Sequence, residues 1–366
     1  MGTRRGAGGR RRASGAAVVL ALAGGLVGAA CAPAGGASRA GDAPAAPATA
    51  SATGRAVPSA GCAAPAPAPL DDARQTMTVD GAARWYLLTT PPAGVGPRAR
   101  PVVLDLHGLG EGAQIHATTT QFGAKAAATG FIAAFPEGTG TPVGWDLDNK
   151  AARNPDIDFL SALLRRLEST MCVDTSRLYV TGLSDGALMT SVLACTMAGT
   201  FAAFAPVSGI SMPTPCHPGR RVPILTFHGT ADPILYFNGG VGTGVLDHAL
   251  GGGPAPPSTT LPPARLNGPG IPAAVRAWAV LDGCHPAGRD ARPHPHIVLR
   301  TYRCPTGAAV EFYIVVGGGH AWPGSRFSAA IASITGPTTF EVRATDVIWQ
   351  FFRRYQLPRP RAAHPG

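Results

Sequence analysis

Along the chain, short apolar runs of strand length alternate with longer runs that have helical spacing. Strands that are apolar throughout and separated by helices are typical of a mainly parallel sheet with helices on both faces. The order of these runs therefore predicts an α/β fold. Asn154 followed by Pro155 marks one helix start, since Asn caps helices and Pro fits their first position. Buried strands are predicted at 101–107, 131–135, 177–183 and 222–228.

The predicted sheet begins with an antiparallel hairpin at its edge. Residues 76–79 and 84–88 flank Asp80-Gly81, a dipeptide typical of a two-residue hairpin turn. Residues 238–270 are rich in Gly and Pro, which predicts a loop. The elements predicted after this loop are a helix at 272–281, strands at 297–302 and 310–316, and a final amphipathic helix at 339–355.

The N-terminus has the pattern of an export signal. An Arg-rich start precedes an apolar run over 16–30, which is too short to span a bilayer but suits a signal peptide. Small residues directly before Cys31 resemble a bacterial lipoprotein signal, in which this Cys becomes the lipidated first residue. The alternative is cleavage at an ordinary A-x-A site, which would release the protein. Both alternatives predict a signal peptide over 1–30 and an exported protein.

Composition divides the rest of the chain. Residues 31–70 are mostly Ala, Pro and Gly, and such a segment cannot bury enough apolar surface to fold, so it predicts a disordered tether. A catalytic domain is predicted over 71–357 and a disordered tail over 358–366.

Half of the net charge of +10 lies before Cys31, and the remaining cations form no stripe with aromatic residues. We therefore expect no nucleic-acid partner, and membrane contact only through a lipid anchor.

The cysteines predict disulfides. Seven are present, and six remain when Cys31 is set aside, an even number in an exported chain. None of them forms a C-x-x-C pair, so a zinc or redox site is not expected. Cys284 and Cys304 flank the turn between a predicted helix and the next strand, and we pair them. The pairing of the other four cysteines stays open. The preferred pairs are Cys195 with Cys216 and, by elimination, Cys62 with Cys172.

A strand, a tight turn and a helix meet at residues 177–189. The turn carries Gly182-x-Ser184-x-Gly186, in which the small residues leave room for the helix and the neighbouring strand. This context is that of a nucleophile elbow, which exposes a strained Ser at the carboxyl end of a sheet. Ser184 is therefore the predicted nucleophile. The alternative is an ordinary turn flanked by glycines.

Two further residues complete a candidate triad. In α/β-hydrolases the chain order is Ser, then Asp or Glu, then His. Asp232 follows a predicted strand end, and His320 follows the last strand behind three glycines. The rival acids Asp247 and Asp282 lie in a loop and at a helix end. Ser184, Asp232 and His320 occur in the required order and each lies just past a strand, so they are the predicted triad.

Backbone N–H groups are expected to form the oxyanion hole. One belongs to Asp185, directly after the nucleophile, and the other to Leu109, in the loop after an early strand. His107 is expected to support that loop by hydrogen bonding, and His228 to be a satisfied core residue. His294-Pro295-His296 has no third ligand nearby, so no metal site is predicted.

Five segments resemble a known family. They look like the secreted feruloyl esterase and poly(3-hydroxybutyrate) depolymerase group of the first carbohydrate esterase family. The resemblance covers roughly 77–355 and implies an α/β-hydrolase fold, the same Ser-Asp-His triad and no cofactor. The segments are Leu106-His107-Gly108, Gly182-Leu183-Ser184-Asp185-Gly186-Ala187, Phe204-Ala205-Pro206-Val207-Ser208-Gly209, His228-Gly229-Thr230-Ala231-Asp232 and Gly318-Gly319-His320-Ala321-Trp322-Pro323-Gly324.

The resemblance also points to substrate contacts. It places Trp145 near the acyl or sugar group, and Tyr236 in the loop that follows the catalytic acid. Together with Trp322 these large flat side chains suit stacking on a phenolic ring or a sugar, the alternative being plain packing. Asp185 stands where the family often has Asn or Ala, and Leu109 where Cys, Tyr or Phe is common.

The sequence thus predicts an exported serine carboxylesterase that acts on short acyl or phenolic-acid esters through an acyl-enzyme. Its partner would be a small or polymeric ester, with no metal or organic cofactor. One alternative is an extracellular polyhydroxybutyrate or polyester depolymerase. Others are a peptidase or a lipase, which the family motifs disfavour, and a non-catalytic surface lipoprotein that keeps the fold for binding.

Overall fold

The computed structural model of the 366-residue chain describes residues 54–150, 153–254 and 261–358. The predicted signal peptide, the predicted lipidation site Cys31 and nearly all of the predicted tail lie outside these residues. In the part of the chain that is described, no helix is both long and apolar enough to cross a membrane.

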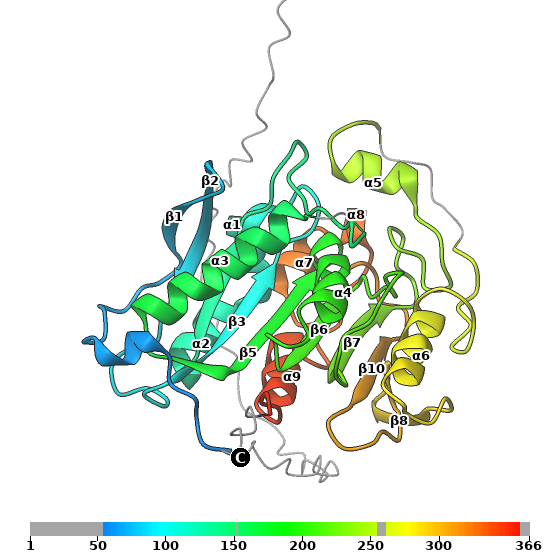
Figure 1. The fold of residues 1–366 in the computed structure, drawn as a ribbon. Helices are drawn as coiled ribbons and strands as arrows, with labels where there is room; N and C mark the ends of the chain where they lie inside the picture. Colours follow the sequence, from blue (N-terminus) through cyan, green and yellow to red (C-terminus); the bar gives the residue numbers. More distant parts are fainter. Residues whose placement is uncertain (1–53, 151–152, 255–260, 359–366) are drawn as a thin grey trace, which may run out of the picture. The chain divides into compact units, whose positions relative to one another are not determined.

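A ten-stranded sheet organises the domain (Figure 1). Its central strands, from β4 to β10 in the spatial order, run parallel, and the outer strands on both sides pair antiparallel. The predicted mostly parallel α/β fold is therefore confirmed. We call the edge where the parallel strands end the carboxyl edge. In spatial order the strands are β1 (Ala73–Val79), β2 (Ala82–Thr89), β4 (Ile132–Pro136), β3 (Arg100–Leu106), β5 (Val173–Leu183), β6 (Ala203–Val207), β7 (Ile224–Gly229), β10 (Val310–Val315), β9 (Ile297–Thr301) and β8 (Arg289–His294).

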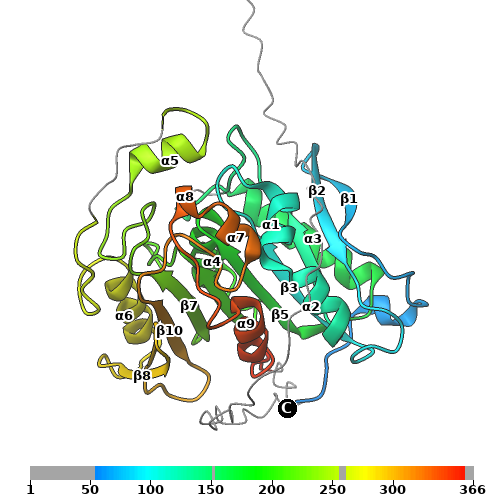
Figure 2. The same ribbon diagram turned by 180° about the vertical axis from the view of Figure 1, so that it is seen from behind.

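Helices cover both faces of the sheet, as predicted. Helices α3, α4 and α6 lie on one face (Figure 1), and α1, α2 and α9 on the other (Figure 2). Successive residues of β3 point to opposite faces, so Val102 and Val103 belong to two separate apolar clusters. The helices are η1 (Ala60–Ala63), α1 (Gly112–Thr120), α2 (Phe122–Thr129), α3 (Pro155–Thr170), α4 (Asp185–Thr196), α5 (Thr243–Ala249), α6 (Ile271–Leu281), α7 (Arg326–Ala330), α8 (Ala332–Thr335) and α9 (Ala344–Phe352).

Local sequence signals explain several element boundaries. The Asn154 side chain accepts hydrogen bonds from the N–H groups of Asp156 and Ile157, so it caps α3 as predicted. Asp80 and Gly81 both have positive φ, 50° and 82°, which suits the tight turn between β1 and β2.

Other boundaries differ from the prediction. The last helix begins at Ala344 rather than at residue 339, and the free N–H of Ala344 donates to the carbonyl of Pro323. Phe340, which lies within the predicted helix range but before the observed helix, is 60% exposed. Strands β6 and β8 were not predicted, and the predicted loop over 238–270 contains the short helix α5.

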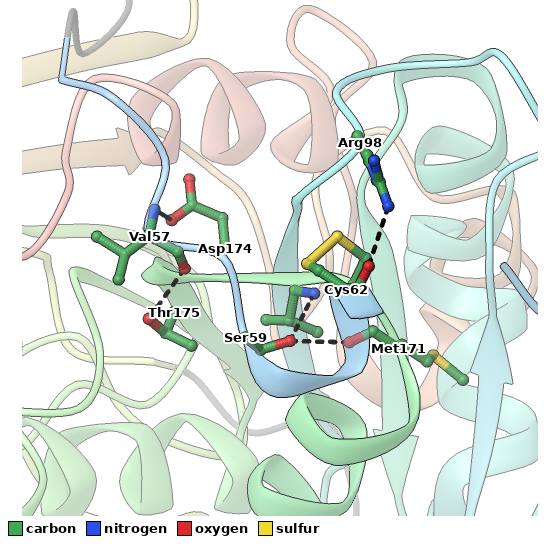
Figure 3. The surroundings of a disulfide bond; sticks show 9 residues. Val57, Ser59, Cys62, Arg98, Met171, Asp174 and Thr175 are labelled. Carbon is green, nitrogen blue, oxygen red and sulfur yellow. Dashed lines mark hydrogen bonds between the residues drawn. A yellow bond between two sulfur atoms is a disulfide. The ribbon is translucent and has the colours of Figure 1, made fainter. Parts of the chain in front are cut away.

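The domain also begins earlier than predicted. Within the predicted tether over 31–70, the Val57 N–H donates to the Asp174 carboxylate at 2.9 Å, and Cys62 is joined to Cys172 by a disulfide (Figure 3). This part of the segment binds the start of β5, so the boundary near residue 71 is wrong. Ala- and Pro-rich composition masked these few specific contacts.

Three disulfides are present in the described residues. Cys62–Cys172 spans 110 residues of sequence and ties the N-terminal segment to β5. The three pairs are the preferred ones: Cys62–Cys172, Cys195–Cys216 and Cys284–Cys304. Such a set is typical of proteins that fold in an oxidising compartment.

Candidate active site

Ser184 lies in a sharp turn between β5 and α4. Its backbone has φ 56° and ψ −116°, a conformation that L-residues rarely adopt. This turn has room between strand and helix only because the residues two positions before and after Ser184 are glycines. A Cβ on Gly186 would lie 2.1 Å from the Leu106 carbonyl oxygen, and one on Gly182 would lie 2.6 Å from the Gly186 carbonyl oxygen. The Ser184 N–H donates to the carbonyl of Val207 on β6 at 3.0 Å, which holds the turn against the sheet.

Asp232 and His320 form a direct pair at the same edge. The His320 Nδ1 lies 2.8 Å from the Asp232 Oδ2. The other oxygen of Asp232 accepts the N–H groups of Ile234 and Leu235, each at 2.8 Å. Burial raises the pKa of Asp232, but the charge and hydrogen bonds of the adjacent imidazoles outweigh it and hold this pKa well below its usual range. Asp232 is therefore an ionised, fully oriented carboxylate.

A second imidazole contacts this carboxylate. The His228 Nε2 lies 3.2 Å from the Asp232 Oδ2 and 2.8 Å from the Leu235 carbonyl oxygen. Sequence reasoning treated His228 as a core residue, and it is indeed buried. Its contact with the acid was missed. The signal that could have revealed it is the four-residue spacing of His228 and Asp232 across a strand end.

Sheet topology brings the three predicted triad residues to one edge. Strands β5, β6, β7 and β10 are neighbours in the sheet and run parallel. Ser184, Asp232 and His320 follow β5, β7 and β10, so all lie at the carboxyl edge. The hydrogen bonds of the described residues join His320 to Asp232, and none of them joins the Ser184 hydroxyl to His320.

The loop after β3 leaves one backbone donor free. The Gly108 N–H donates to the Glu111 carboxylate at 2.8 Å, and the Gly110 N–H donates to the carbonyl of Val143 at 2.7 Å. Among the described residues no acceptor takes the Leu109 N–H between them. This N–H is thus available to a ligand.

The second expected donor is the N–H of Asp185. Asp185 is the first residue of α4, and the first N–H groups of a helix have no partner within it. Its carboxylate accepts the Trp145 backbone N–H at 2.9 Å. Burial raises the pKa of this carboxyl from 3.8 to about 6. The residue whose N–H is the expected oxyanion donor therefore also carries a partly buried carboxyl group.

Trp145, which the sequence predicted as a substrate contact, is instead a buried ring that packs against the loop after β3. It is 8% exposed, and its Nε1 donates to the His107 carbonyl at 2.9 Å. The His107 Nε2 accepts the Gly138 N–H, so the ring proton is on Nδ1, which donates to the Gly108 carbonyl at 2.8 Å. Burial lowers the pKa of His107, which keeps it neutral. His107 thus supports its loop by hydrogen bonding, in the way the sequence indicated.

The other two predicted substrate contacts differ from one another. Trp322 is 1% exposed, packs edge-on against Phe122 and donates its Nε1–H to the Thr345 hydroxyl at 3.0 Å. Its prediction as a substrate contact is therefore wrong, because the loop after β10 turns this ring into the core. Tyr236 is partly exposed and lines a hollow of about 200 Å³ beside Asp232.

Within the described ranges, no cluster of three or more His, Cys, Asp or Glu residues is arranged to hold a metal ion. His296 pairs instead with Glu341, with 2.6 Å between the His296 Nδ1 and a carboxylate oxygen.

Comparison with known proteins places the chain among esterases. No protein-family model matches it. It is 30% identical over 297 residues to "Putative esterase NocK" of Nocardia uniformis subsp. tsuyamanensis, a match that covers 77% of this chain and 84% of the relative. It is 28% identical over 246 residues to feruloyl esterase B of Piromyces equi, covering 65% of this chain and 42% of the relative. The chain thus spans less than half the length of that second protein.

Two further matches agree with these. Feruloyl esterase C of Emericella nidulans is 30% identical over 163 residues, which covers 43% of this chain and 58% of the relative. The solved acetyl xylan esterase from Aspergillus awamori has the same fold, with a TM-score of 0.50 and 15% identity over 68% of this chain and 94% of that one. As the sequence motifs predicted, the chain belongs to the feruloyl-esterase-like family of α/β-hydrolases, which are carboxylic ester hydrolases.

Proposed function

We propose that the protein is an exported serine esterase that cleaves short acyl or phenolic-acid esters through an acyl-enzyme on Ser184. The observation that carries the proposal is the buried Asp232–His320 pair, which lies at the same sheet edge as a serine held at positive φ. A histidine base oriented by a buried carboxylate, acting on a serine held in a strained turn, is the arrangement that serine hydrolases use.

In the proposed acylation step, the Nε2 of His320 takes the proton of the Ser184 hydroxyl as the oxygen attacks the ester carbonyl. The N–H groups of Leu109 and Asp185 stabilise the negative oxygen of the tetrahedral intermediate. His320 then gives its proton to the leaving alkoxide, the carbon–oxygen bond of the ester breaks, and the alcohol departs.

In the proposed deacylation step, His320 takes a proton from water as the water oxygen attacks the acyl carbonyl. His320 then returns this proton to the Ser184 oxygen as the bond between that oxygen and the acyl carbon breaks, which releases the acid and restores the free enzyme. Asp232 keeps the proton of neutral His320 on Nδ1, leaving Nε2 free to act as the base. The bonds from Asp232 to the backbone of the following loop hold it in place for this role. No step in this scheme needs a metal or an organic cofactor.

The substrate class and the location rest on separate arguments. The names of the feruloyl esterase relatives favour phenolic-acid esters, and Tyr236, in the loop after the acid, is a partly exposed aromatic ring suited to stacking. Disulfides favour export, with lipidation at Cys31 as the proposed means of retention. A polyester depolymerase is the alternative substrate class, and a non-catalytic binding protein is the alternative of another kind.

The deciding experiment is labelling with a fluorophosphonate, followed by a substrate panel. Wild type should react at one serine, and Ser184→Ala should lose both labelling and hydrolysis while its melting temperature hardly changes. The panel compares p-nitrophenyl esters from acetate to palmitate with methyl ferulate, acetylated xylan and polyhydroxybutyrate. Activity that survives in Ser184→Ala would refute the mechanism, and a preference for palmitate or for the polyester would refute the substrate class.

A further inference from the structure

A buried charged cluster lies behind the loop that carries Leu109. The His116 Nε2 lies 2.8 Å from the Asp105 Oδ1, and its Nδ1 lies 3.0 Å from the Glu111 Oε2. The Asp105 and His116 side chains are fully buried, and that of Glu111 is 13% exposed. Ionisable groups are almost never buried to this extent unless they are paired, so this cluster is built into the fold. None of its members belongs to the proposed triad.

The hydrogen-bond partners of His116 show which of its ring nitrogens carry a proton. Both ring nitrogens of His116 face carboxylate oxygens, which only accept, so both nitrogens carry a proton. The remaining oxygens also have partners. The Thr120 hydroxyl donates to Asp105 at 2.6 Å, and the Thr119 hydroxyl shares its proton between Glu111 at 2.9 Å and the Ile115 carbonyl at 3.0 Å. Burial lowers the pKa of His116, but the two carboxylates outweigh it and raise the pKa to about 10. The cluster is thus an imidazolium held between two carboxylates.

Glu111 connects this cluster to the backbone at the oxyanion site. The Glu111 Oε2 accepts the Gly108 N–H at 2.8 Å, and the Glu111 N–H donates to the Gly108 carbonyl at 3.1 Å. The same carbonyl accepts the His107 Nδ1–H at 2.8 Å. Both polar groups of the Gly108 backbone are therefore held.

The geometry of the peptide bond carries this constraint to Leu109. The Gly108 carbonyl and the Leu109 N–H belong to one planar trans peptide group, so they point in opposite directions. A carbonyl held by two donors on one side therefore directs the Leu109 N–H to the other side. Gly108 itself is close to the nucleophile, because a Cβ built on it would lie 3.4 Å from the Ser184 Cβ.

We propose that Asp105, His116 and Glu111 form a positioning relay that holds the Gly108–Leu109 peptide in the orientation needed to stabilise the oxyanion. This inference rests on the proposed function, because it takes the Leu109 N–H as an oxyanion donor. None of the three residues touches the substrate. Their expected effect is on the reaction rate rather than on substrate binding.

The test compares Glu111→Ala with Glu111→Gln. Alanine removes the acceptor of the Gly108 N–H, whereas glutamine keeps a carbonyl oxygen there, loses the charge and carries an amide NH2 in place of the oxygen that faces Thr119. For Glu111→Ala we expect kcat to fall by about 10²-fold, the cost of misplacing a group by about 1 Å, with little change in KM. Glu111→Gln should recover most of this loss. Wild-type kcat in folded Glu111→Ala would overturn the inference.

Asp174→Ala is the matched control. Asp174 is also a buried carboxylate that accepts a backbone N–H, that of Val57, but it lies at the start of β5, away from the carboxyl edge (Figure 3). It should lower the melting temperature and leave kcat per folded molecule unchanged. If it lowered kcat as much as Glu111→Ala at a similar loss of stability, the relay would be only structural and the inference would fail.

Two further variants keep the outcomes separate. If Glu111→Ala does not fold, Thr119→Val decides, because it removes one donor to Glu111 and should lower kcat several-fold at constant KM. An unchanged kcat in that variant would overturn the inference. Ser184→Ala separates the two proposals. If it is inactive while the Glu111 variants have wild-type kcat, only the relay fails, whereas activity in Ser184→Ala refutes the proposed function itself.

Discussion

Asp185 makes the stability of this protein depend on pH in a direction that can be worked out. Burial raises the pKa of its carboxyl from 3.8 to about 6. The folded state therefore keeps a proton that the unfolded chain has already lost between these two values. The free energy of unfolding therefore falls as the pH rises through this interval. Above pH 6 the destabilisation by the buried carboxylate is complete. Below about pH 4 the carboxyl is protonated in both the folded and the unfolded state, and this destabilisation disappears.

The substitution that removes this destabilisation is Asp185→Asn. The amide oxygen of Asn still accepts the Trp145 N–H, and the backbone N–H of residue 185 is unchanged. The difference between 3.8 and about 6 corresponds to at most about 3 kcal/mol. Asp185 is partly exposed, and solvent screening reduces the expected gain at pH 8 to about 1–2 kcal/mol. In a domain of this size that raises the melting temperature by about 2–4 °C per kcal/mol.

The assay is thermal and urea unfolding of wild type and Asp185→Asn from pH 4 to pH 8. The stability difference should be near zero at pH 4, grow between pH 4 and pH 6, and then stay constant. Esterase activity at pH 8 should be retained, since the proposed oxyanion donor is a backbone group. A difference that is equal at all pH values, or a variant that is less stable at pH 8, would refute the reasoning.

Three other perturbations have defined outcomes. Asp232→Asn should lower kcat by about 10⁴-fold, because the N–H groups of Ile234 and Leu235 retain the amide oxygen and the NH2 group then faces His320, which favours the wrong tautomer; steady-state kinetics on a p-nitrophenyl ester would measure this. Replacing Cys62 and Cys172 together by Ser should lower the free energy of unfolding by about 2–5 kcal/mol in urea titrations, with kcat unchanged. Trp145→Phe removes the donor to the carbonyl behind the oxyanion loop, and should lower kcat several-fold with little effect on KM.

The sequence was informative wherever the determining contacts are local. The elbow at Ser184 follows from glycines at fixed offsets, whose missing side chains the close approach of strand and helix requires. The cap at Asn154 and the turn at Asp80 follow from backbone preferences of single residues. Chain order and strand ends then sufficed to select Asp232 and His320, which the structure joins by a hydrogen bond.

Contacts that depend on tertiary packing could not be predicted in this way. An Ala- and Pro-rich segment looks disordered by composition, and only the distant partner Asp174 reveals that Val57 is bound. An aromatic ring near a catalytic His looks like a substrate contact, and only the path of the loop shows that Trp322 faces the core. In both cases the deciding atoms come from another part of the chain.

The relay behind the oxyanion loop did leave a signal in the sequence. Asp105 interrupts an otherwise apolar strand, and a carboxylate at such a position costs free energy unless it is paired and hydrogen-bonded. The strained Ser184 and the raised pKa of Asp185 are further features that an optimally stable fold would avoid. All three lie where β3 and β5 end, at the carboxyl edge of the sheet. Local preferences are expected to be violated mainly at functional sites, so the presence of three such unfavourable features at one edge of the sheet supports the proposed site there.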